Sequence, residues 1–233
     1  MTIHTSRFVR PLKVTVTSFV LAATLVDCGG GGSGNGQHGG TTAAEVTQLI
    51  SAILSRPVEA LSATESASLA LIREEEKLAH DVYGVAAAQW GLNAFVNIGA
   101  GESMHQQALL ALLDRYTLAD PAAGLVEGQF SQATFTTLYT PLSSKARLSL
   151  IDALQVGLEI EELDIKDIET TKLGVDNADI LYAYNELQRG SRNHLRSFWK
   201  QLQQQGGSYT PSHITQAEFD AIANSATEPA MAP

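Results

Sequence analysis

A carboxylate and an imidazole lie one helical turn apart in the segment GAGESMHQQALLALLDRY, residues 99–116. Glu102 and His105 share the three-and-four spacing of Leu109 and Leu112, which is typical of the buried face of a helix. A carboxylate buried without a partner is costly and usually takes up a proton instead. A divalent cation bound between the two side chains would offset that cost and keep the carboxylate ionised. The pair therefore indicates a metal site.

Three further predicted helices carry metal-binding side chains on their apolar faces. Each of these side chains lies near the middle of its helix, where the helices of a bundle face one another. The positions are Glu76 in the first long helix, Glu161 with Glu162 at its border in the third, and His194 in the fourth. Because four such positions would not converge by accident, we expect them to hold a pair of divalent cations.

Helices have to position these residues, because the chain from residue 41 onward shows no strand-like alternation of any length. The expected helices span 41–55, 62–89, 96–116, 146–172 and 177–205, with a last short one after Thr215. Capping boxes at Thr42, Ser62 and Thr215 mark three of the helix starts. Between the second and third long helices, a short helix interrupted at Pro141 is the most that the sequence predicts.

The connections between the four long helices predict their arrangement. Short connections join the first to the second and the third to the fourth, so each pair should be antiparallel. About thirty residues separate the two pairs, and a loop that long usually crosses a domain and joins helices that run parallel. The sequence therefore predicts an all-α fold, a ferritin-like four-helix bundle over residues 61–206, with short extra helices in 42–60 and 207–233.

Four motifs carry a resemblance to a known superfamily. EKLAHDVY, ESMH, EIEELDIKDIE and SRNH, in this order, resemble the ferritin-like di-iron carboxylate proteins along residues 62–205. The strings EEEKLAHDVY, IEELDI and RGSRNHLRSF resemble more closely the ferritin-like domain-of-unknown-function family 2202. In the superfamily two helices supply one glutamate each and the other two supply a Glu-x-x-His turn. The resemblance implies the ligands Glu76, Glu102, His105, His194 and either Glu161 or Glu162, with Tyr83 beside the site as a hydrogen-bond donor or an electron source.

Ser191 departs from the superfamily pattern, because it stands where the fourth helix should carry its own glutamate. Either Glu159 or Glu162 compensates from the third helix, or one of the two metal positions is weak. The chain also lacks a Cys-x-x-Cys pair, so it carries no rubredoxin-type electron-transfer module.

The start of the chain is expected to direct and tether the protein. Residues 1–27 combine a positive start with an apolar run of signal-peptide length, and Cys28 follows directly, as in bacterial lipoproteins whose cysteine is lipidated. Asp27 replaces the small residue usual before that cysteine, so an ordinary secretory signal is the alternative. Residues 28–41 form a glycine-rich tether. We expect a lipoprotein on the periplasmic face of the envelope, with the outer membrane as the default, or a secreted protein if Cys28 is not lipidated.

Charge and cysteine content exclude several classes of partner and site. The net charge of −10 argues against nucleic acid. Cys28 is the only cysteine, which excludes an intrachain disulfide and an all-cysteine metal site. The expected partners are metal ions, O2 or H2O2, and the membrane through the lipid anchor only, and a homodimer is left open.

Three functions fit these observations. The first is a protein that binds two iron ions, or alternatively manganese or a mixed Fe/Mn pair, because mixed carboxylate and imidazole ligands suit these metals. If it is an enzyme, it would be an oxidoreductase, either a ferroxidase or peroxidase-like, using O2 or H2O2 in oxidative-stress or metal handling. The second is a non-catalytic metal-binding or sequestering lipoprotein, which Ser191 favours. The third is a metal-free helical scaffold module.

Other charged residues are expected at the surface. Glu74, Glu75 and Lys77 would form a solvated helix face, and Asp164 and Asp167 would face solvent. The arginines of RGSRNHLR could alternatively form an anion-binding patch; they are Arg189, Arg192 and Arg196.

Overall fold

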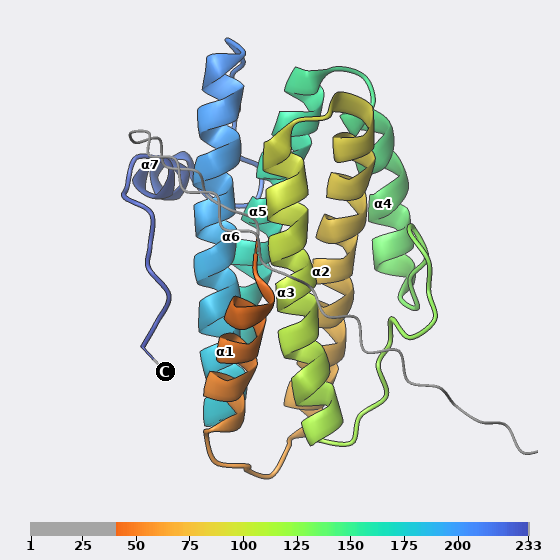
Figure 1. The fold of residues 1–233 in the computed structure, drawn as a ribbon, viewed down its shortest axis with the longest axis vertical. Helices are drawn as coiled ribbons and strands as arrows, with labels where there is room; N and C mark the ends of the chain where they lie inside the picture. Colours follow the sequence, from red (N-terminus) through yellow and green to blue (C-terminus); the bar gives the residue numbers. More distant parts are fainter. Residues whose placement is uncertain (1–40, 233) are drawn as a thin grey trace, which may run out of the picture. The chain divides into compact units, whose positions relative to one another are not determined.

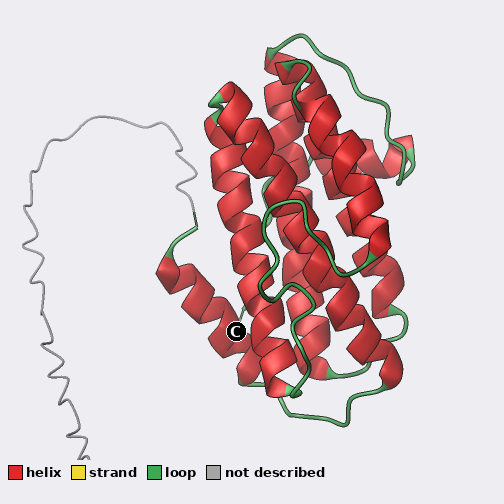
Figure 2. Ribbon diagram, turned by 90° about the vertical axis from the view of Figure 1, so that its right-hand side faces the viewer, coloured by secondary structure: helices red, strands yellow, loops and turns green. Residues whose placement is uncertain are grey.

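The computed structural model describes residues 41–232, and these contain seven α-helices and no strand (Figure 2). The helices are α1 (Ala43–Leu54), α2 (Ala63–Trp90), α3 (Asn93–Arg115), α4 (Ala133–Ala146), α5 (Leu150–Lys172), α6 (Ala178–Gln204) and α7 (Gln216–Ala223). The expected signal peptide, Cys28 and tether residues 28–40 lie outside the described part of the chain. None of the seven helices is both long and apolar enough to cross a membrane. The predicted all-helical class is confirmed.

Local chemistry sets the helix boundaries. The hydroxyls of Thr42, Ser62 and Thr215 each accept a hydrogen bond from the backbone N–H three residues on, where a glutamate bonds back to the cap. Gly91 ends α2 with φ of 61°, a left-handed conformation that glycine adopts without strain. The three predicted capping boxes are confirmed.

Helix α4 differs from the expectation, because it continues through Pro141. Proline removes one helical hydrogen bond, which usually kinks or ends a helix. However, α4 packs against α2 and α5 and buries Phe135, Leu142 and Ala146. Tertiary packing therefore outweighs the local cost, and the predicted interruption at Pro141 is wrong.

The four long helices α2, α3, α5 and α6 pack as a bundle. Helix α2 contacts α3 and α5, and α6 contacts α5 and α3. Figure 1 shows that α2 and α3 run antiparallel, as do α5 and α6. The connection that contains α4 returns along the bundle, so α5 starts at the end where α3 starts and runs parallel to it.

A polar layer lies between two apolar clusters inside the bundle. One cluster includes Tyr83, Leu158 and Phe198. The other includes Leu69, Leu109 and Leu187. On α2, α3 and α6 the predicted metal ligands fall between these two clusters in sequence, and on α5 they lie at the end of the first cluster, before Ile168 of the second. The polar layer is therefore closed by apolar side chains at both of its ends.

The REEEK segment, residues 73–77, is buried and is not the solvated face that the sequence suggests. Glu74 accepts hydrogen bonds from the backbone N–H groups of Ser131 and Gln132, just ahead of α4. Lys77 donates to the backbone carbonyl of Val126 at 2.9 Å. For Glu74 and Lys77 the cause is the connection between α3 and α4, which runs across this side of α2 (Figures 1 and 2), whereas Glu75 faces α5. The expected exposure of Glu74, Glu75 and Lys77 is wrong.

Candidate metal centre

Glu76 of α2 and Glu102 and His105 of α3 form the first of two buried groups that could hold a metal ion. The Nδ1 atom of His105 lies 3.0 Å from Glu76 Oε2 and 2.9 Å from Glu102 Oε2. At most 2% of any of these three side chains is exposed. Two helices thus bring one imidazole nitrogen and two carboxylate oxygens to one point.

Glu102 also belongs to the second group, with Glu161 of α5 and His194 of α6. The Nδ1 atom of His194 lies 2.8 Å from Glu102 Oε1 and 3.5 Å from Glu161 Oε2. The centroids of the two imidazole rings are 5.7 Å apart. Glu102 therefore lies between the two histidines and turns one oxygen toward each of them.

Several oxygens of the two groups lack a hydrogen-bond donor among the described residues. These are both oxygens of Glu102, Oε1 of Glu76 and Oε2 of Glu161. The Glu102 oxygens lie close to the imidazole nitrogens without the alignment of a hydrogen bond. Since buried polar atoms normally have a hydrogen-bond partner, unpartnered carboxylate oxygens beside imidazole nitrogens fit a bound cation.

Burial and mutual charge set the protonation of the groups without a metal. Burial raises the pKa of Glu76 to about 7, although the charge of His105 works against this rise. Burial and the charge of Glu102 raise the pKa of Glu161, also to about 7. Burial disfavours the charged form of His105, but Glu76 and Glu102 outweigh it and raise the pKa of His105 to about 10. Burial opposes ionisation of Glu102 as well, yet the charges of His194 and His105 hold its pKa below the ordinary value. Without a metal, the protonated imidazoles of His105 and His194 thus supply positive charge beside these carboxylates.

Tyr83 connects the centre to the apolar cluster beside it. Its hydroxyl donates a hydrogen bond to Glu161 Oε1 at 2.6 Å. Burial and the charge of Glu161 raise the pKa of Tyr83, so the phenol keeps its proton. The hydrogen bond occupies one oxygen of Glu161 and leaves Oε2 facing His194. Tyr83 therefore lies beside the candidate centre as a hydrogen-bond donor to Glu161.

Both histidines pack against glycine on the opposite helix. A Cβ added to Gly190 of α6 would lie 2.6 Å from His105 Nε2, and one added to Gly101 of α3 would lie 2.9 Å from His194 Nε2. Such distances are shorter than real contacts of a Cβ atom. The two glycines let α3 and α6 approach each other closely enough for each imidazole to reach the centre.

The comparisons with known proteins identify the family. The family DUF2202, described as an uncharacterised protein domain, matches residues 65–226. The chain belongs to the DUF2202 family. The uncharacterised protein MJ0754 of Methanocaldococcus jannaschii is 41% identical over 183 residues, which cover 78% of this chain and 99% of that protein. The crystal structure of hypothetical protein MJ0754 from Methanococcus jannaschii is similar with a TM-score of 0.72 and 42% identity, covering 74% of this chain and 98% of that one.

The DUF2202 match contains the whole candidate centre, since it spans nearly all of α2 and every helix after it. Both buried groups are thus part of the DUF2202 domain of this chain. The expected signal peptide and tether precede that domain.

Three of the residues predicted to complete the centre of this DUF2202 protein lie outside both groups. Glu162 Oε2 accepts hydrogen bonds from the backbone N–H groups of residues 212 and 213, at 2.8 and 3.0 Å. Glu159 pairs with Lys145 at 3.2 Å. Ser191 is buried and donates to the carbonyl of Leu187 in its own helix. Because Glu162 follows Glu161 by one residue, its side chain points about 100° away around the helix. Neither Glu159 nor Glu162 therefore takes the expected compensating role in the structure.

Two buried acids beside the centre were not predicted. Glu75 and Asp164 are almost fully buried, and the expected solvent exposure of Asp164 is wrong. Their carboxyl groups interact with each other, and neither receives a hydrogen bond from another type of group among the described residues. Burial and the charges of Asp167 and Glu76 raise the pKa of Glu75, while burial and Glu75 raise that of Asp164. The available signal was spacing: Asp164 lies three residues after Glu161, on the same side of α5.

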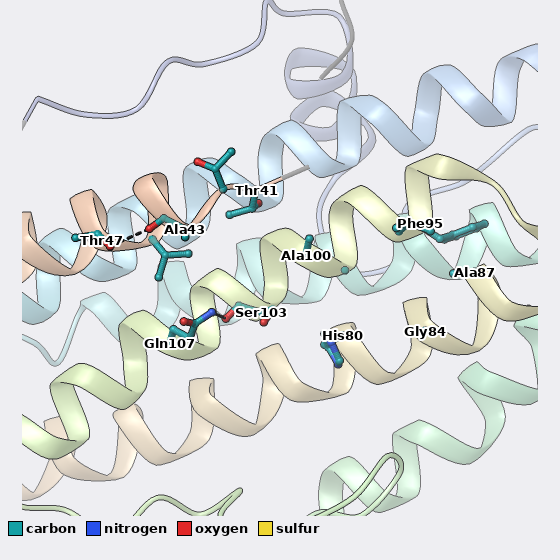
Figure 3. A pocket seen from close by; sticks show the side chains of 14 residues that line it. Thr41, Ala43, Thr47, His80, Gly84, Ala87, Phe95, Ala100, Ser103 and Gln107 are labelled. Atoms are coloured by element: carbon teal, nitrogen blue, oxygen red, sulfur yellow. Dashed lines mark hydrogen bonds between the residues drawn. The ribbon is translucent and has the colours of Figure 1, made fainter. Parts of the chain in front are cut away.

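A surface groove of the described residues is separate from the centre. It has a volume of about 710 Å3 and lies over α2 and α3 beside the start of α1. Figure 3 shows His80 of α2 and Ser103 and Gln107 of α3 around it, and its lining contains none of the five candidate ligands. The groove therefore gives no support to a small-molecule active site at the metal centre.

The packing of glycine against histidine predicts that two similar substitutions in α3 differ strongly in their effect on metal affinity. Gly101→Ala should displace His194 and weaken one metal position by roughly tenfold or more, as is typical when support for a ligand is lost. Gly99→Ala is the matched control, because its Cβ would meet only Tyr83 Cβ, at 3.8 Å. Alanine at this helical position should raise the free energy of unfolding by roughly 0.5–1 kcal/mol. Titration with Co(II) and thermal unfolding would check both, and equal Co(II) affinities would contradict the role given to Gly101.

Proposed function

We propose that this DUF2202 protein binds two divalent metal ions, most favourably iron, in a ferritin-like bundle. The observation that carries the proposal is Glu102, which belongs to both buried groups and offers one oxygen beside each histidine. A carboxylate that serves two cations at once needs this placement. Glu76 and His105 would complete one position, and Glu161 and His194 the other.

Iron suits the donor set, and manganese is the alternative. Each group combines two carboxylates with one imidazole, and the described residues contain no cysteine that would favour zinc or copper. Two iron ions would supply the electrons that reduce O2 or H2O2. We therefore propose Fe(II) oxidation with one of these oxidants as the activity.

The residues of this chain have defined tasks in that proposal. Glu102 holds both positions together, and Tyr83 orients Glu161 through its hydrogen bond. His105 and His194 carry protons while they pair with carboxylates, and they have to release these protons when a cation binds. The apolar clusters on either side exclude water from the polar layer.

Metal sequestration without turnover is the second candidate, favoured by the count of carboxylates. Two divalent cations bring four positive charges, and the two groups contain three carboxylates: Glu76, Glu102 and Glu161. Ser191 adds no charge, and Glu159 and Glu162 bond elsewhere. This shortage of charge would weaken one position.

The test is metal content followed by reaction with oxygen. The chain, purified without a tag, should retain two iron ions after loading with Fe(II) under nitrogen and desalting. Stopped-flow absorbance on mixing with O2 should show Fe(II) oxidation faster than in buffer alone. Retention of iron without faster oxidation would favour sequestration. Absence of retained iron and manganese would reject both candidates and leave the metal-free scaffold.

A further inference from the structure

Asp164 lies on the side of α5 that carries Glu161. It follows Glu161 by three residues, so both side chains project from the same side of the helix. In α3 the same spacing separates Glu102 from His105, and these two belong to one of the buried groups. Only 1% of Asp164 is exposed. Its carboxyl group is therefore inside the bundle, one helical turn from a candidate ligand.

The fold itself provides no donor for this carboxyl group. Among the described residues, three buried acids have two oxygens without a donor other than a carboxyl group: Glu75, Glu102 and Asp164. Other acids nearby are satisfied within the fold, as Glu74 is by the backbone N–H of residue 132 and Glu162 by those of residues 212 and 213. Since buried polar atoms normally have a partner, the pair of Glu75 and Asp164 indicates a ligand from outside the chain.

Asp164 is the member of this pair that faces the centre. Burial raises the pKa of Asp164, and the charge of Glu75 and then the charges of all three carboxylates of the two groups add to the rise. Burial raises the pKa of Glu75 as well, but there the added charges are those of Asp167 and Glu76. Asp167 is only partly buried. Glu75 therefore connects the pair to the surface at Asp167, and Asp164 connects it to the centre.

The two groups lack one negative charge for two divalent cations. They contain three carboxylates against four positive charges, and Ser191 on α6 adds none. Glu159 pairs with Lys145, and Glu162 bonds backbone N–H groups. Asp164 is bound to no such partner, and its charge would make the two sums equal.

We propose that Asp164 is a further ligand of the two-metal centre and supplies the fourth carboxylate, which Ser191 does not provide on α6. The inference rests on the proposed metal binding and adds to it a residue from outside the two groups. Because Asp164 belongs to neither group, its side chain has to turn from Glu75 toward the centre when the second ion binds. With this ligand the shortage of charge that favours sequestration disappears.

The first experiment counts bound ions with Mn(II) as the probe, because the paramagnetic resonance signal of free Mn(II) reports what remains unbound. The unsubstituted chain should bind two ions, and Asp164→Asn should weaken one of them by more than tenfold. Glu75→Gln is the matched control, because it removes the other, equally buried member of the same pair, and it should still bind two ions. Equal Mn(II) affinities in Asp164→Asn and Glu75→Gln would overturn the ligand role of Asp164.

The second experiment separates the loss of a ligand from damage to the fold. At pH 8 Asp164→Asn should melt at a higher temperature than the unsubstituted chain without metal, because a buried charge is gone, but saturating Mn(II) should raise its melting temperature less. A lower melting temperature without metal, together with weaker binding, would assign Asp164 a structural role and overturn the proposal.

The two proposals fail in different ways. If the unsubstituted chain binds neither Mn(II) nor iron, the proposed metal function fails and the ligand role of Asp164 fails with it. If the unsubstituted chain and Asp164→Asn both bind two ions with equal affinity, the metal function stands and the ligand role alone is rejected.

Discussion

Replacing Glu102 with glutamine should remove both metal ions at once, whereas Glu76→Gln and Glu161→Gln should each remove one. Glu102 is the only residue shared by the two buried groups of the described chain. An amide has one oxygen instead of two and carries no negative charge, so it cannot serve two cations. The loss at each position should be about a hundredfold in affinity or more, since one of two carboxylates is removed from each group.

Metal content after loading with Fe(II) under nitrogen would measure these losses, and Glu169→Gln on the exposed side of α5 is the control. Circular dichroism would establish that each variant is folded. Glu102→Gln should stay folded, because glutamine keeps the size of glutamate. The imidazoles can also lose their protons when the carboxylate between them is gone. One ion remaining bound to Glu102→Gln would contradict the shared placement and would indicate a single-metal site.

The helical fold and the core of the site could be predicted because both depend on local periodicity. Glu76 and Glu102 interrupt apolar stripes whose other members are fully buried, such as Ile72 and Leu109. A polar group on such a stripe has to face the interior, and the interior of a bundle is common to its helices. The structure accordingly brings Glu76, Glu102, His105, Glu161 and His194 together.

The errors concern residues whose surroundings are made by distant segments. Nothing in the periodicity of α2 shows that the connection after α3 covers Glu74. Similarly, the side chain of Glu162 is held by backbone N–H groups some fifty residues later in the chain. Arg192 and Arg196 of the expected anion-binding patch are occupied by the Glu228 carboxylate, which is also a long-range contact. Such contacts follow from the path of loops, which sequence spacing does not encode.

Raising the pH should destabilise the metal-free protein and should strengthen the stabilisation that metal provides. Glu76 and Glu161 have a pKa of about 7 in the folded chain against an ordinary value of 4.5, and the pKa values of Glu75 and Asp164 are raised too. A carboxyl with a raised pKa stabilises the fold below its unfolded pKa, and this stabilisation is lost as the pH rises through the folded pKa.

The other groups of the centre do not reverse this trend. The raised pKa values of His105 and His194 act in the same direction, because the stability that they contribute begins to fall once the pH rises above the ordinary histidine value of 6.5. Glu102, whose pKa is lowered, changes stability only below pH 4.5. Between pH 5.5 and 8 the melting temperature of the metal-free chain should therefore fall by roughly 6–12 °C, which corresponds to about 3 kcal/mol. With saturating metal the melting temperature should instead rise with pH, because cations bind the deprotonated ligands.

Asp164→Asn should raise the melting temperature of the metal-free chain at pH 8 and reduce its fall with pH. Asp164 and Glu75 are both almost fully buried, with no cation among the described residues beside their oxygens. An asparagine of the same shape removes one buried charge and can donate an N–H to Glu75, so the gain should be about 1–3 kcal/mol. Asp167→Asn is the matched control, because Asp167 also faces Glu75 but is only partly buried, and its effect should be smaller. Thermal unfolding at pH 5.5 and 8, with and without metal, would measure the melting temperatures of both variants.

If Asp164→Asn lowers the melting temperature at pH 8 in the absence of metal, the ionised carboxylate is compensated in a way that its burial and missing donors do not reveal. If it stabilises the metal-free chain but abolishes metal binding, Asp164 supplies the fourth negative charge that Ser191 does not.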